Sequence, residues 1–157
     1  GPVPELLAAA RRGECVVEMI GDGVHLAPAI VLDVFETLGR ESVVLVTDAM
    51  AAAGMPDGDY VLGPAAVTVA DGVARLRDGG AIAGGTAHLI DVVRTTWRGG
   101  VDLVDAVYAA SCQGAEILGD RSIGALEPGR WADLVVTDAE LAPVRVLRRG
   151  EVVASSL

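Results

Sequence analysis

Histidine, cysteine and aromatic residues are scarce in this 157-residue chain, and each shortage narrows what the protein can be. The chain has two histidines and two cysteines, and its aromatic content is 3%. A structural zinc site would need all four of these ligands, but Cys15 and Cys112 lie far apart and no C-x-x-C motif occurs. We expect two reduced thiols, as in a protein of the cytoplasm.

Positive charge and long apolar runs are also in short supply. Lys and Arg number 12 against 22 Asp and Glu, a net charge of −10. Such a surface repels nucleic acid and anionic lipid, so we expect neither as a partner. Every apolar run is broken well before the roughly 18 residues that a membrane span needs. No secretion signal is visible, and the lack of Met at residue 1 predicts that the natural chain begins earlier.

The chain does have a large apolar fraction, 52%, and its first fifty residues alternate between helical and strand patterns. This order predicts right-handed βαβ crossovers and a parallel sheet, hence an α/β fold. The predicted elements are helices at 4–12 and 28–38 and strands at 15–20 and 43–46. His25 and Asp48 each follow a strand, at the carboxyl-terminal edge where ligands of such sheets bind.

The remainder is more varied. Residues 51–80 are rich in glycine, and Asp71-Gly72 between short alternating segments predicts a hairpin. Helical periodicity returns over 86–98 and 102–118, and the chain ends in short apolar runs typical of strands.

Three features could carry chemistry. Asp48 could ligate a metal or accept a proton from water, or it could simply cap a turn. His25 could hydrogen-bond a substrate or be a structural loop histidine. Residues 82–86 could present backbone N–H groups to an anion at a helix start, or form a plain loop with Thr86 as N-cap. His88, inside a helical pattern, is read as structural.

Taken in order, four segments resemble the N-acetylglucosamine-6-phosphate deacetylases of the amidohydrolase superfamily. They are G-D-G-V-H-L-A-P at 21–28, L-V-T-D-A-M at 45–50, I-A-G-G at 82–85 and G-A-L-E-P-G-R-W-A-D-L-V-V at 124–136. The resemblance implies the C-terminal part of a (β/α)₈ TIM-like hydrolase barrel, with the C-terminal strands of a small β-domain. Residues 1–126 would belong to the barrel, with a β-hairpin excursion at about 59–77, and residues 127–157 to the β-domain.

The resemblance also implies roles for single residues. Asp48 matches the family's catalytic aspartate, His25 a substrate-binding histidine, and Ile82, Ala83 and Gly84 the loop that holds the sugar. The family's divalent metal, zinc or similar, is held by a glutamate and two histidines from earlier strands, and no residue here matches them. We therefore expect no metal to be bound by this chain alone.

The implied reaction is metal-assisted deacetylation of N-acetylglucosamine 6-phosphate to glucosamine 6-phosphate and acetate. The complete enzyme would take this amino-sugar phosphate as its partner and form a homodimer, whereas this chain alone would be inactive. Two alternatives remain at this point. One is a different amidohydrolase, dihydroorotase-like or deaminase-like, and the other is a non-catalytic fold fragment or assembly module.

Overall fold

The centre of the molecule is a parallel pair of short strands, β1 (Val17–Met19) and β2 (Val43–Leu45), joined by helix α2 (Pro28–Leu38). The computed structural model describes residues 3–155. All residues of β2 are buried, as expected for an apolar run inside an α/β layer. Proline occupies the first turn of α2, where its missing N–H costs nothing, and Gly39 ends the helix at φ 77°. The predicted βαβ order is confirmed.

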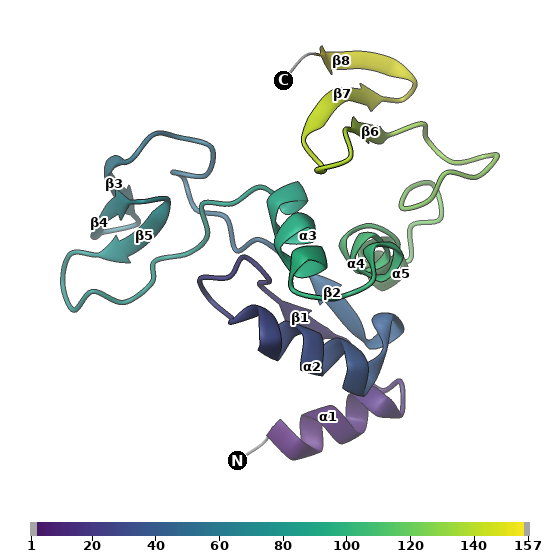
Figure 1. The fold of residues 1–157 in the computed structure, drawn as a ribbon, viewed down its shortest axis with the longest axis horizontal. Coiled ribbons are helices and arrows are strands. Elements are labelled where there is room, and N and C mark those ends of the chain that lie inside the picture. The colour runs from purple at the N-terminus through teal and green to yellow at the C-terminus, as the bar shows by residue number, and fades with distance from the viewer. Residues whose placement is uncertain (1–2, 156–157) are drawn as a thin grey trace.

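Helices pack around this strand pair and build the main core (Figure 1). Helix α1 (Val3–Arg11) precedes β1, while α3 (Leu89–Arg98), α4 (Leu103–Ala110) and α5 (Cys112–Leu118) follow later in the chain. The buried core residues are Met19, Val31, Phe35, Val43, Leu45, Val92, Val93, Val101, Ala106, Ala109 and Leu141.

A separate antiparallel sheet interrupts the chain between β2 and α3. It contains β3 (Gly58–Leu62), β4 (Ala65–Ala70) and β5 (Val73–Leu76), in that order, and lies to the left in Figure 1. The hairpin predicted at Asp71-Gly72 joins β4 to β5. This excursion sheet has its own small core of Met50, Ala52, Val67, Val69, Ala74 and Ala83.

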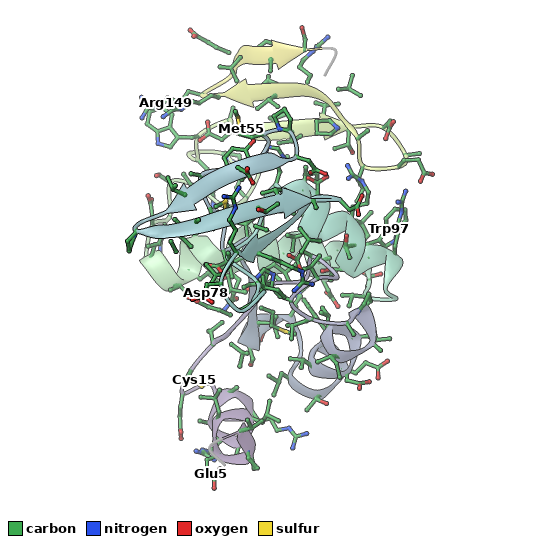
Figure 2. The ribbon with its side chains drawn as sticks, turned by 90° about the vertical axis from the view of Figure 1, so that its left-hand side faces the viewer. Glu5, Cys15, Met55, Asp78, Trp97 and Arg149 are labelled. Atoms are coloured by element: carbon green, nitrogen blue, oxygen red, sulfur yellow. The ribbon has the colours of Figure 1, made fainter. Side chains whose placement is uncertain are left out.

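The chain ends in a second antiparallel sheet of β6 (Leu134–Thr137), β7 (Pro143–Arg148) and β8 (Glu151–Ser155). Figures 1 and 2 place this C-terminal sheet and α1 at opposite ends of the molecule, with Arg149 labelled on the former and Glu5 on the latter. None of the helices within residues 3–155 is both long and apolar enough to cross a membrane.

Helix α3 begins later than the sequence pattern indicates. It starts at Leu89 rather than near Thr86, and His88 is its N-cap. The backbone N–H of Asp91 donates to the carbonyl oxygen of His88, and the Asp91 carboxylate accepts a hydrogen bond from the backbone N–H of His88. The Thr86 hydroxyl instead donates to the carbonyl oxygen of Gly72. The glycine pair at 84–85 is therefore part of a loop and does not open the helix.

Arg94 fixes the turn between β6 and β7 of the C-terminal sheet to α3. Its side chain is 21% exposed, and its guanidinium pairs with Asp91 and donates to the carbonyl oxygens of Glu140 (2.9 Å) and Leu141 (2.6 Å). We expect Arg94→Leu to lower the free energy of unfolding by about 2–3 kcal/mol, because two carbonyls and a carboxylate lose their partner. Urea denaturation measures this loss.

The neighbouring Arg98 provides the matched control. Arg98 pairs with the Glu140 carboxylate, and the two side chains are 56% and 71% exposed. Because exposed ion pairs contribute little, Arg98→Leu should cost less than about 1 kcal/mol. Equal losses for the two variants would contradict the anchoring role of Arg94.

Candidate functional site

The carboxyl ends of β1 and β2 lie side by side at one edge of the parallel pair. Met19 is in register with Leu45, and the N–H of Val46 donates to the carbonyl oxygen of Met19 at 3.0 Å. The loops that carry His25 and Asp48 therefore leave the sheet at the same edge. This is the arrangement that parallel strand order predicts for ligand-binding loops.

Asp48 is exposed and has left-handed backbone geometry, with φ at 50°. Aspartate tolerates this region better than most residues, and such geometry often marks functional positions. Within residues 3–155 no hydrogen bond or ion pair engages its carboxylate, so a capping role has no support in the contacts. The side chain is left to interact with water or a ligand.

The segment 82–85 lies directly against Asp48. The N–H of Gly85 donates to the Asp48 carbonyl oxygen at 2.7 Å, and the N–H of Met50 donates to the Gly85 carbonyl oxygen at 2.9 Å. On its other side, the segment is bonded to β5 through the Ala83 N–H and the Ala74 carbonyl oxygen, at 2.9 Å. Ile82, Ala83 and Gly84 are thus held between the excursion sheet and Asp48.

His25 follows a tight turn and bonds to a residue that the sequence reasoning did not single out. Its Nδ1 lies 2.8 Å from Oδ2 of Asp22, and the two side chains are 18% and 6% exposed. The other carboxylate oxygen of Asp22 accepts from the backbone N–H groups of Val24 (2.9 Å) and His25 (2.8 Å). The spacing Asp-x-x-His directly after a strand is the signal that could have identified this pair.

The pKa of Asp22 reflects opposing effects. Burial by itself raises it, but hydrogen bonds from the backbone and ring of His25, and from the backbone of Val24, outweigh burial and hold the pKa below its usual value. Asp22 is therefore a carboxylate at neutral pH.

Acid should weaken the contribution of Asp22 to stability. A carboxyl whose pKa is lower in the folded than in the unfolded protein stabilises the fold above its unfolded pKa of about 3.9, and this stability is lost as pH falls through the folded value. At about pH 7 we expect Asp22→Asn to cost roughly 1–2 kcal/mol. Urea denaturation at decreasing pH should show this difference shrinking below about pH 4, and a constant difference would contradict the assignment.

Some of the predicted site residues are in direct contact, and the others share only the same edge of the parallel strand pair. Asp48 and the segment 82–85 are in direct backbone contact, whereas His25 is related to Asp48 through the paired strands that precede them. Two open cavities of about 490 and 640 Å³ are lined by other residues. Neither of these two cavities is lined by His25, Asp48 or residues 82–84.

The side chains that the structure describes do not by themselves fit a metal site. Among residues 3–155, no group of three or more His, Cys, Asp and Glu side chains is placed to hold a metal ion. A single carboxylate such as Asp48 leaves most of the coordination shell to other groups. The residues from 3 to 155 thus do not supply a three-ligand set for a metal ion.

Comparison with known proteins places this geometry in a family. An N-acetylglucosamine-6-phosphate deacetylase of Vibrio furnissii is 38% identical over 141 residues, covering 88% of this chain and 35% of the relative. A putative N-acetylgalactosamine-6-phosphate deacetylase of Escherichia coli K12 is 38% identical over 137 residues, covering 86% of this chain and 81% of that protein.

Solved structures of deacetylases are also similar to this chain. The N-acetyl-D-glucosamine-6-phosphate deacetylase of Mycobacterium smegmatis, as an aspartate-to-alanine variant in complex with N-acetyl-D-glucosamine-6-phosphate, superposes with a TM-score of 0.89 at 42% identity. The match covers 99% of this chain and 41% of the solved chain. The expected fold class, the C-terminal part of a hydrolase barrel with strands of a small β-domain, is confirmed.

The chain is shorter than the relatives it matches. The chain spans 35% of the V. furnissii protein and 41% of the M. smegmatis protein, so it corresponds to part of each. The profile of the amidohydrolase family, whose enzymes are generally metal-dependent, matches residues 6–155. The chain belongs to the amidohydrolase family.

Proposed function

We propose that this chain forms part of an enzyme that deacetylates an N-acetylated amino-sugar 6-phosphate, with N-acetylglucosamine 6-phosphate as the substrate. The observation that supports this most directly is the exposed, unpartnered carboxylate of Asp48 beside the backbone of residues 82–85. The relatives named above are deacetylases of N-acetylglucosamine or N-acetylgalactosamine 6-phosphate. Water would cleave the amide bond to give the free amino sugar and acetate.

Asp48 is proposed to move the proton. Its carboxylate accepts a proton from the attacking water and returns it to the sugar nitrogen as the carbon–nitrogen bond breaks. A carboxylate without hydrogen bonds from the protein is free to approach water in this way. Because the backbone of Asp48 is held by Gly85, its position relative to a bound sugar is set by the segment 82–85.

His25 and the segment 82–84 are proposed to bind substrate. His25 hydrogen-bonds to the acetamide group, where negative charge builds on oxygen during hydrolysis. Ile82, Ala83 and Gly84 present main chain close to Asp48, and glycine at position 84, with φ at 83°, allows the backbone to approach a ligand closely.

The metal and the remaining partners belong to the complete enzyme. A divalent metal such as zinc would polarise the amide or its water, and its ligands would come from outside the described residues. We therefore propose that this chain alone releases no acetate. The complete enzyme is proposed to be a homodimer of the cytoplasm.

A chimera tests the proposal. This chain replaces the matching 41% of the M. smegmatis deacetylase, to which it is 42% identical. The purified chimera, supplied with zinc, should release acetate from N-acetylglucosamine 6-phosphate, whereas this chain alone should release none. A folded but silent chimera, or turnover by the isolated chain, would overturn the proposal.

A further inference from the structure

A histidine that binds a ligand offers one of two ring nitrogens, and the protein decides which one. In the neutral ring one nitrogen carries a proton and donates, while the other accepts. The group bonded to one nitrogen thereby fixes the role of the other. In His25 the Nδ1 atom is engaged by Asp22 at 2.8 Å, so Nε2 is the ring nitrogen left for a ligand.

The chemistry of Asp22 determines the direction of this hydrogen bond. Its Oδ1 atom already accepts two backbone N–H groups, from Val24 and His25. An ionised carboxylate has no proton to donate, so Oδ2 can only accept. The hydrogen atom between Oδ2 and Nδ1 must therefore lie on Nδ1, whatever the charge of the ring.

The turn that carries Asp22 is held firmly in place. Gly21 packs so closely on α3 that an added Cβ would lie 2.5 Å from Oγ1 of Thr96, and Gly23 has a φ of 79°. Asp22 itself has only 6% of its side chain exposed. The turn thus restrains the position of the Asp22 carboxylate, and with it the orientation of the His25 ring.

We propose that Asp22 is the positioning residue of His25, holding Nδ1 protonated and presenting Nε2 to the substrate. The proposal rests on the proposed function only in naming that substrate. When the ring is neutral, Nε2 accepts a hydrogen bond from a sugar hydroxyl or an N–H. When the ring is protonated, Nε2–H donates to the acetamide oxygen.

Asp22→Asn should invert the tautomer rather than merely loosen the ring. The two backbone N–H groups keep the amide oxygen of the new side chain in the place of Oδ1. Its NH₂ group then faces Nδ1 of His25 and requires an acceptor there. The proton moves to Nε2, the form that free histidine also favours.

The experiment is long-range ¹H–¹⁵N correlation NMR on the ¹⁵N-labelled 157-residue chain at about pH 9, where histidine is ordinarily neutral. The chain has two histidines, so a His88→Gln variant assigns both rings. In the wild-type chain His25 should give the Nδ1–H pattern. In Asp22→Asn the ratio of Nδ1–H to Nε2–H should fall by about tenfold or more, because a hydrogen bond to a charged group is lost.

The second histidine supplies a matched control. His88 and Asp91 have the same three-residue spacing, but their side-chain atoms are 3.5 Å apart and His88 is 67% exposed. Asp91→Asn should leave the tautomer of His25 unchanged. An Nε2–H tautomer in the folded wild-type chain, or an unchanged ratio in folded Asp22→Asn, would overturn the proposal; if Asp22→Asn does not fold, the wild-type spectrum decides. Since no substrate is present, failure here is distinct from failure of the deacetylase proposal.

Discussion

Asp48→Asn should lower kcat for acetate release by about 10²–10⁴-fold in the barrel completed with the M. smegmatis segment. The amide that replaces the carboxylate is isosteric but cannot take up a proton at neutral pH. Because no described residue hydrogen-bonds to the Asp48 carboxylate, the substitution should leave the fold intact. Steady-state kinetics with N-acetylglucosamine 6-phosphate measures the change, and KM should move far less than kcat.

Asp71 supplies the control for this substitution. It is also exposed and also left-handed, with φ at 51°, but it lies in the hairpin turn between β4 and β5. Asp71→Asn therefore makes the same chemical change in the same backbone geometry. Its kcat should stay within about twofold of the parent, since it touches no proposed substrate group. An Asp48→Asn variant with kcat within tenfold of the parent would remove Asp48 from the mechanism.

Gly85→Ala should be severely destabilising, by about 3 kcal/mol or more. An added Cβ would collide with the carbonyl oxygen of Thr47, a backbone atom that cannot rotate away. Gly85 is hydrogen-bonded to Asp48 and Met50 on either side of this contact. The collision can therefore be relieved only if the segment 82–85 separates from the segment that carries Asp48. In the completed barrel the same separation should abolish measurable turnover, because the loop would move away from Asp48.

Gly114→Ala is the matched glycine substitution. Gly114 lies within α5, and an added Cβ would meet nothing within 4 Å. Alanine there should raise the free energy of unfolding by about 0.5–1 kcal/mol, since glycine is the poorer helix former. Urea denaturation of both variants gives the comparison. A Gly85→Ala variant within about 1 kcal/mol of the parent would show that the contact is easily relieved.

Local signals were sufficient for the parts of the fold in which chain chemistry and tertiary packing agree. Helix α2 has the predicted limits. Its start and end are set by residues at its own termini, Pro28 in the first turn and Gly39 directly after the last. The start of α3 depends on more distant partners. The bond from Thr86 to Gly72 spans fourteen residues, and no helical pattern reveals it. Strand β3 was likewise obscured by surrounding glycine and proline.

The sequence likewise predicted some features of the candidate site and not others. That His25 and Asp48 follow strands was readable from the sequence, because parallel strands share one carboxyl edge. Asp48 and Gly85 lie on either side of the excursion sheet in the sequence, and their contact was not predicted. The family resemblance assigned only Asp48 and residues 82–84 to one substrate site. Asp22 was within reach of sequence reasoning, three residues before His25, but its role depends on side-chain geometry that spacing alone does not give.

Ala83 belongs to two environments at once. It is a buried member of the small core of the excursion sheet, and it is also one of the three loop residues proposed to hold the sugar. Any repacking beneath that sheet would therefore also displace a wall of the proposed sugar site. Substrate preference within this family could thus diverge through substitutions that never touch the sugar, and screens confined to ligand-contacting positions would overlook them.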